Sequence, residues 1–297
     1  MRQVRPPTLG LLVIAGVLGL GAVACSNDGT APGAPLLSQA QADSLSEQLT
    51  LDAEDEILGA TASGDASFSA VAPTAPPSAG VTARCTPTRS PASPTDTDND
   101  GVADSVRLDF ADCVFSWPFE TDSLRGTIDV LDPTKALPDH AVERIFTNLA
   151  HVRVFTISGK QTSETRNGTR MTSRDATSLQ NSETNFRTDY VFRDGSTATH
   201  VKTWTSTFTA DVTGSIQHDQ ALPSGTWNVN GTSSWTRGTR TYSLTVTTNP
   251  PLHYNATCTA FPRFDAGTLT AAITRNGETM NVVVQFTACG QYTVTRS

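Results

Sequence analysis

Lysine is almost missing from this 297-residue chain, and methionine and aromatic residues are scarce. Three methionines occur, the aromatic share is 7%, and the only lysines are Lys135, Lys160 and Lys202. The formal net charge is −8 at pH 7. A chain with this acidic balance is repelled by the phosphates of nucleic acids and by anionic lipid headgroups. We therefore expect no nucleic-acid partner and no broad electrostatic attraction to membranes.

The motifs of common hydrolases are also missing. The sequence has no His-Glu-x-x-His motif, and residues 231–235 depart at their last position from the Gly-x-Ser-x-Gly elbow of hydrolases. The histidines are scattered at His140, His151, His200, His218 and His253. Carboxylates that could pair for acid–base chemistry are Asp122, Asp129, Asp132, Asp139 and Glu143. Their spacing does not indicate that they converge, so the sequence predicts no enzyme.

Only one long hydrophobic run stands out, and it lies at the N-terminus. Leu9–Leu20 follows Arg2 and Arg5 and is followed by Ala22, Val23, Ala24 and Cys25. A basic start, an apolar stretch and small residues before a cleavage point are the parts of a secretory signal. An uncleaved membrane anchor is the alternative, because residues 8–24 approach the roughly 20 residues that span a bilayer.

The end of this signal resembles the lipobox of bacterial lipoproteins, with Ala22 where that pattern usually has Leu. The resemblance implies that residues 1–24 are removed and that Cys25 carries the lipid. Each buried acyl methylene contributes about 0.8 kcal/mol, so several chains such as palmitate form a stable anchor. Ser26 follows the cysteine, which in this family implies the outer membrane if the cell has two. Cleavage removes two arginines and no acid, taking the net charge from −8 to −10.

Cysteines are few, and setting Cys25 aside leaves an even number. The remaining four are Cys85, Cys113, Cys258 and Cys289. In an exported protein such a set indicates disulfides, and four cysteines allow three pairings. Proximity in the sequence favours Cys85–Cys113 and Cys258–Cys289. A zinc site is the alternative, although no Cys-x-x-Cys spacing is present.

Three segments precede the main domain. Residues 25–36 are small and polar, which predicts a lipidated flexible tether. Residues 37–60 place Leu and Ala near helical spacing and predict one helix. Residues 61–95 are rich in Pro, Ala and Ser and predict a disordered linker, because repeated prolines oppose regular structure.

Residues 96–297 alternate apolar and polar side chains, as in residues 241–247 and 280–288. This period of two predicts strands. The pairs Asn167-Gly168, Asp194-Gly195 and Asn276-Gly277 predict turns between them. No helical pattern intervenes, so a parallel sheet is not expected. The predicted fold class is mainly β: an antiparallel meander of roughly nine to eleven strands, as an up-and-down barrel, a curved sheet or a sandwich.

The β domain opens with the clearest local motif, Asp96–Asp104, which we call the Asp loop. Its sequence, DTDNDGVAD, resembles the calcium loops of EF-hands and, more closely, of thrombospondin type 3 repeats. Calcium requires six to eight oxygen ligands, and a glycine (here Gly101) permits the sharp turn that gathers them. The resemblance implies these ligands: Asp96, Asp98, Asp100, the carbonyl of Val102, and Asp104.

The Asp loop also departs from the EF-hand pattern. Arg107 occupies the twelfth position, where EF-hands place a bidentate Glu, and Pro91 and Pro94 stand where a helix would precede the loop. We therefore expect a weak calcium site with a structural role. A solvated acidic turn without metal is the alternative.

Together these patterns predict an exported, lipid-anchored cell-envelope protein with a non-catalytic structural or interaction role and calcium as a structural ligand. Its expected partners are the membrane, through the lipid, and an unidentified protein. One alternative is a periplasmic or outer-membrane carrier of a lipid or other apolar ligand. Aromatic side chains on apolar strand faces would then line a cavity: Trp204, Trp227, Trp235, Tyr242, Tyr254 and Phe286. A hydrolase of envelope material is the second alternative.

Overall fold

A computed structural model describes part of residues 36–53 and most of residues 82–297. The described residues are 36–39, 42–43, 45–46, 49–50, 53, 82–84, 87–111, 113–116, 120–137, 140–155, 158–217, 221–260 and 262–297. The chain divides into two units, Met1–Pro35 and Leu36–Ser297, and every described residue belongs to the second. The predicted signal, tether, Cys25 and Cys85 lie outside the described residues. No helix within the described ranges is both long and apolar enough to cross a membrane.

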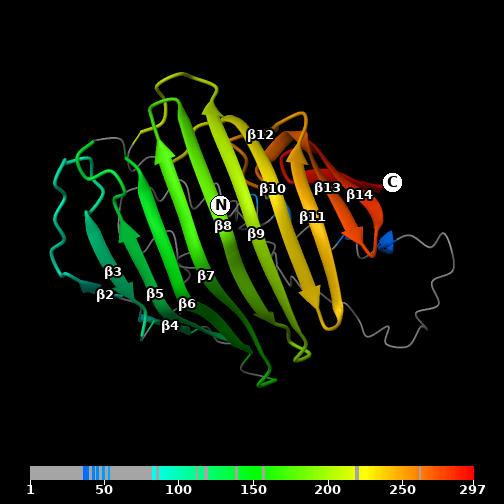
Figure 1. The fold of residues 1–297 in the computed structure, drawn as a ribbon, viewed down its shortest axis with the longest axis horizontal. Coiled ribbons are helices and arrows are strands. Elements are labelled where there is room, and N and C mark those ends of the chain that lie inside the picture. Colours follow the sequence, from blue (N-terminus) through cyan, green and yellow to red (C-terminus); the bar gives the residue numbers. More distant parts are fainter. Residues whose placement is uncertain are drawn as a thin grey trace, which may run out of the picture. The chain divides into compact units, whose positions relative to one another are not determined.

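In this part of the chain, fifteen strands form one antiparallel sheet (Figure 1). The strands are β1 (Thr82–Arg84), β2 (Thr88–Ser90), β3 (Ser105–Asp109), β4 (Cys113–Ser116), β5 (Glu120–Leu131), β6 (Val142–Phe155), β7 (Gln161–Arg174), β8 (Ser178–Val191), β9 (Thr197–Ala210), β10 (Gly225–Arg237), β11 (Arg240–Thr248), β12 (Leu252–Tyr254), β13 (Phe264–Arg275), β14 (Glu278–Ala288) and β15 (Gln291–Arg296). The predicted antiparallel meander is confirmed.

Most strands pair with their neighbours in the sequence. The order runs β1-β4-β5-β6-β7-β8-β9-β10-β11-β13-β14-β15, and β3 and β4 occupy successive stretches beside β5, as β11 and β12 do beside β10. Figure 1 shows a twisted, curved sheet. Of the three predicted arrangements, the described strands match the curved sheet. The strands outnumber the prediction because β1, β2 and β12 have only three residues each and β4 has only four. Both β1 and β2 lie in the segment predicted to be a linker.

A line of β-bulges crosses the middle of β5, β6, β7 and β8. At each bulge one residue has a positive φ angle: Gly126, Asn148, Gly168 and Asn185. A Cβ atom on Gly126 would lie 2.2 Å from the carbonyl oxygen of Asn148, so only glycine fits there. Because bulges bend strands and increase their twist, this line accounts for curvature in the middle of the sheet.

Two of the three predicted turns are confirmed. Asp194-Gly195 lies between β8 and β9, and Asn276-Gly277 joins β13 to β14 with Arg275 opposite Glu278. The turn predicted at Asn167-Gly168 is wrong, because this pair lies inside β7 at the bulge. A bulge requires the same positive φ angle as a tight turn, so the local sequence signal is the same.

Two apolar clusters share one face of the sheet, which we call the inner face. One cluster spans β8 to β14 and includes Trp204, Phe208 and Trp227; the other spans β3 to β8. The second cluster includes Phe186, whose register partner in β9 is Lys202, two residues before Trp204. The carrier alternative places Trp204 and Trp227 among the residues that line a cavity, but both are fully buried core residues.

The N-terminal helical segment packs against the first of these clusters. Its described helical positions lie within the predicted helix, and Ala42, Leu49 and Ala53 belong to the cluster. Their spacing of seven and four residues places them on one side of a helix, as expected for an amphipathic helix on a sheet. The side chain of Arg296 in β15 donates to the carbonyl of Leu37.

Candidate functional site

The Asp loop is a formed turn, held by its own carboxylates. Asp98 Oδ1 accepts the backbone N–H of Asp100 at 3.2 Å, and Asp100 Oδ1 accepts that of Val102 at 2.7 Å. Asp96 Oδ2 accepts the N–H of Gly101 at 3.0 Å. Each of the three carboxylates therefore uses one oxygen to close the loop. The second oxygen of Asp100 accepts the backbone N–H of His140 at 2.8 Å.

Carboxylate oxygens of the three residues also converge. Asp96, Asp98 and Asp100 each offer one carboxylate oxygen, and these atoms all lie within 4.8 Å of one another. Calcium–oxygen distances are about 2.3–2.6 Å, so two ligands of one ion are at most about 5 Å apart. Asp96 Oδ1 and Asp98 Oδ2 are buried and have no hydrogen-bond partner in the described part of the chain. The geometry thus fits a small hard cation.

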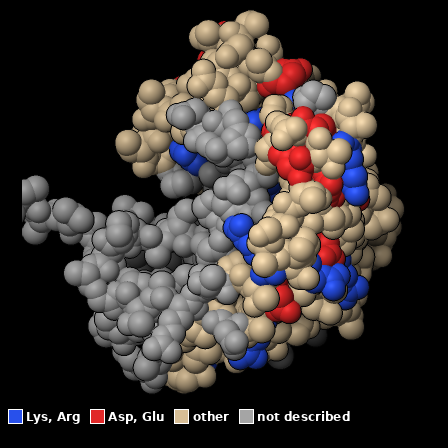
Figure 2. All heavy atoms as spheres, turned by 90° about the vertical axis from the view of Figure 1, so that its left-hand side faces the viewer, with Lys and Arg blue, Asp and Glu red and all other residues tan. Residues whose placement is uncertain are grey.

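Electrostatics at the loop also favour a cation. Partial burial raises the pKa of the Asp98 carboxyl, and the nearby charges of Asp100 and Asp132 raise it further. A hydrogen bond from the backbone of Asp100 acts in the opposite direction. Figure 2 shows acidic side chains gathered on the side of the molecule where Figure 1 places β2, β3 and β5.

Asp104 makes hydrogen bonds within the loop. The Asp104 carboxylate accepts the backbone N–H of Thr97 at 2.9 Å and the hydroxyls of Thr95 and Thr97 at 2.8 and 2.7 Å. These hydrogen bonds lower the pKa of Asp104 and tie the two ends of the loop together. The Val102 side chain is fully buried in the cluster beneath β3 and β5. Asp104 does not belong to the converging carboxylate group, whereas the carbonyl of Val102 stays a predicted ligand.

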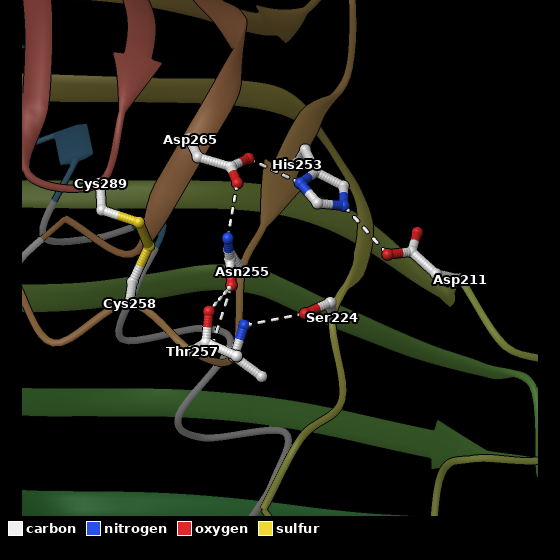
Figure 3. A network of polar contacts seen from close by, with 9 residues as sticks. Asp211, Ser224, His253, Asn255, Thr257, Cys258, Asp265 and Cys289 are labelled. Atoms are coloured by element: carbon white, nitrogen blue, oxygen red, sulfur yellow. Dashed lines mark hydrogen bonds and ion pairs between the residues drawn. A yellow bond between two sulfur atoms is a disulfide. The ribbon is translucent and has the colours of Figure 1, made fainter.

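Of the two predicted disulfides, Cys258–Cys289 is confirmed. It joins the segment after β12 to the turn after β14 (Figure 3). Cys113 is buried in the second apolar cluster and forms a disulfide. Its predicted partner, Cys85, lies outside the described residues.

A line of buried charges crosses the inner face between the two apolar clusters. Arg144, Arg170 and Glu183 are direct neighbours on β6, β7 and β8. Glu183 Oε1 accepts from Arg170 Nε at 2.7 Å, and Glu183 Oε2 lies 2.9 Å from Lys202 Nζ in β9. Burial opposes ionisation of Glu183, but Arg170 and Lys202 outweigh it and lower its pKa. Burial, reinforced by the charge of Arg170, lowers the pKa of Arg144 to about 10, so Arg144 stays charged at neutral pH.

A second polar cluster lies beside the Cys258–Cys289 disulfide (Figure 3). His253 Nδ1 lies 2.6 Å from Asp265 Oδ1, and His253 Nε2 lies 3.0 Å from Asp211 Oδ2. Asn255 donates to the other oxygen of Asp265 at 2.7 Å. Partial burial opposes protonation of His253, but the two carboxylates outweigh it and raise its pKa. The histidine therefore joins β12 to β13 and to the segment after β9, with both ring nitrogens occupied.

Two of the other candidate carboxylates lie in ion pairs across strands. Asp122 Oδ2 contacts His151 Nε2 and Asp122 Oδ1 contacts Arg153 Nε, both at 3.2 Å. Asp129 and Arg107 form a bidentate pair at 2.7 and 2.8 Å. Asp139 and His218 lie outside the described residues. These contacts join β3 and β6 to β5.

One set of polar groups, on the inner face of β9 and β10, was not predicted from the sequence. Four successive rungs of this ladder pair Lys202 with Ser233, Trp204 with Gly231, Ser206 with Val229, and Phe208 with Trp227. Each rung holds one buried polar atom without a hydrogen-bond partner among the described residues: Ser233 Oγ, Trp204 Nε1, Ser206 Oγ and Trp227 Nε1. Alternation alone assigns these positions to an apolar core, so it does not predict that polar atoms are buried there without partners.

No family model, no curated protein and no solved structure matches this chain. Inferences about its function therefore rest on its own residues.

Proposed function

We propose that the protein is a lipid-anchored, non-catalytic component of the cell envelope whose β domain is stabilised by calcium in the Asp loop. The observation that carries this proposal is the convergence of Asp96, Asp98 and Asp100, with two buried carboxylate oxygens that lack hydrogen-bond donors in the described chain. A buried carboxylate oxygen without a donor is costly, and a divalent cation offsets that cost. The polar clusters elsewhere join strands, which supports a structural or interaction role.

The anchor is supported by the lipobox-like sequence before Cys25. We expect the intact mass of the protein from a bacterial host's membranes to be that of a chain starting at Cys25 and carrying acyl groups. Cys25→Ser should lose the acyl mass, because serine offers no thiol, whereas Ser26→Ala should retain it. A wild-type chain without acyl mass would contradict the anchor.

Calcium should bind in the range of extracellular modules, with a Kd of about 10⁻⁴–10⁻³ M. At a hundred times Kd this binding stabilises the folded state by about 2.7 kcal/mol, which corresponds to a Tm rise of roughly 5–10 °C. In Asp98→Asn/Asp100→Asn both amide oxygens can still accept the loop N–H groups, but two charges are lost. We expect calcium to leave the Tm of this variant unchanged.

Asp109→Asn is the matched control. Asp109 Oδ1 accepts the N–H of Ala111 in a similar turn, outside the carboxylate group. Thermal unfolding of the full chain in detergent, followed by calorimetry with calcium and then with chelator, distinguishes the two variants. A wild-type protein whose Tm does not respond to calcium would rule out the metal site and leave a solvated acidic turn.

A carrier of an amphiphilic ligand is the second candidate. The four buried polar atoms of β9 and β10 support it, because they lie among aromatic rings and two of them are indole N–H groups, which can only donate. A lipid whose ester oxygens accept hydrogen bonds from these donors would satisfy them. Native mass spectrometry of the same preparation tests it, since a carrier retains a lipid mass that organic extraction removes.

A further inference from the structure

His253 lies between two carboxylates that come from different parts of the sheet (Figure 3). Its Nδ1 lies 2.6 Å from Asp265 Oδ1 in β13, and its Nε2 lies 3.0 Å from Asp211 Oδ2, just after β9. Both partners are carboxylate oxygens, which only accept hydrogen bonds when they are ionised. The ring therefore satisfies both contacts only when each of its nitrogens carries a proton, that is, when the histidine is charged.

The charges around the ring favour this protonated form. Asp211 and Asp265 are the charged groups that act on His253 among the described residues. Its register partners on the two strands packed against β12 are uncharged: Thr226 in β10 and Ala266 in β13. Partial burial lowers the pKa of the histidine, but the two carboxylates outweigh it and raise the pKa above its usual 6.5. Both contacts are thus complete below pH 6.5 and are weakened as the pH rises through the raised pKa.

The two contacts differ in how firmly they are held once the ring is neutral. A neutral imidazole has a single N–H, so one of the two contacts must lose its hydrogen bond. Asp265 is the better-held partner, because Asn255 donates to its second oxygen at 2.7 Å and β13 pairs with β12. Asp211 lies outside the strands, and its side chain is 46% exposed against 27% for Asp265. Water therefore replaces the histidine more readily at Asp211.

We infer that His253 is a pH switch, whose charged ring holds Asp211 and Asp265 at once and whose neutral ring releases Asp211. This inference is independent of the calcium site, because no residue of the Asp loop takes part. The switch acts on the connection between β9 and β10, which begins at Asp211 and places the Ile216 side chain in the first apolar cluster. Release of Asp211 loosens the start of this connection, while the pairing of β12 with β13 and the nearby disulfide stay in place.

Hydrogen exchange followed by mass spectrometry tests the inference on the full chain in detergent, with calcium present throughout. Protection of the peptides that contain residues 211–217 is measured at about pH 6 and about pH 9, on either side of the histidine titration. Each value is taken relative to the exchange rate of the unfolded peptide at the same pH. The backbone N–H of Asp211, which donates to the carbonyl of Ser224 at 3.0 Å, lies in these peptides. We expect protection to be about fivefold lower at the higher pH, the upper range for an exposed ion pair.

The variant Asp211→Asn should remove the pH dependence. Its amide can accept a hydrogen bond from Nε2–H or donate one to a bare Nε2, so the contact survives in both states of the ring. His151→Gln is the matched control, because this histidine also contacts a carboxylate, Asp122 at 3.2 Å, and it should keep the wild-type behaviour. Equal protection of the wild type at both pH values, or a loss that persists in Asp211→Asn, would overturn the inference.

The ring nitrogens give a second readout that requires no change at Asp211. Nitrogen NMR of the protein with isotopically labelled histidine distinguishes the charged ring from its two neutral forms, and His253→Gln identifies the signal of His253. We expect a charged ring at the lower pH and a neutral ring with its proton on Nδ1 at the higher pH. A neutral ring with its proton on Nε2 would contradict the inference, because Asp211 would then keep its donor.

Discussion

Glu183→Gln is expected to lower the free energy of unfolding by about 3–5 kcal/mol, the cost of removing one partner from a buried ion pair. Glu183 is 1% exposed and is the anion that both Arg170 and Lys202 contact. Glutamine has nearly the same shape, so the loss comes from charge rather than from packing. Denaturant unfolding at pH 7 measures it as a lower midpoint with an unchanged slope.

The pH dependence has a definite sign. Since the pKa of Glu183 is lowered in the folded protein, its contribution is present above its ordinary value of 4.5 and is lost as the pH falls through the folded value. The difference between wild type and variant should therefore narrow in acid. Asp189→Asn is the control on the same strand: its pair with Arg187 is exposed, and we expect a change under about 1 kcal/mol. Equal effects of the two substitutions would contradict a special role for the buried anion.

Removing the Cys258–Cys289 disulfide should cost about 3–4 kcal/mol in the chain-entropy model. The bond closes a separation of 31 residues that contains all of β13 and β14. The double variant Cys258→Ser/Cys289→Ser leaves the folded strands in place but gives the unfolded chain more freedom. Denaturant unfolding should therefore show a lower midpoint, and a shift below about 1 kcal/mol would contradict this account.

The double variant is a cleaner test than a reducing agent. Cys113 also forms a disulfide, and reduction would break both bonds at once. In reductant neither protein has a disulfide, so the two should converge. The loss of stability that reductant causes in the double variant gives the contribution of the Cys113 bond, and the difference between the two proteins without reductant gives that of Cys258–Cys289.

Local patterns in the sequence were enough for the meander and for part of the site. Alternation identifies strands such as β11 and β14, and Asn276-Gly277 identifies the turn between β13 and β14. Both signals depend only on residues next to one another in the sequence. The converging group of Asp96, Asp98 and Asp100 was predicted for the same reason. Whether a metal occupies it stays a prediction.

The features that the sequence did not predict depend on the register in which the strands pair. Alternation predicts that charged residues face water, yet Glu183 and Phe186 share the inner face, because the bulge between them shifts the parity of β8. The backbone of Asp132 contacts Asp104 only because β3 pairs with β5. Asp104, a predicted ligand, is instead hydrogen bonded to Thr95 and Thr97, an outcome that residue spacing does not reveal.

The contact between Arg296 and Leu37 bears on the order of folding. Hairpins between neighbouring strands close short loops, whereas this contact joins residues 259 positions apart. Loop-closure entropy makes it costlier than a hairpin of about 25 residues by roughly 2 kcal/mol. The helical segment is made first but can reach this final place only after β15 exists. Until then the apolar inner face of a growing chain stays uncovered by that segment, which is the period of greatest exposure to aggregation.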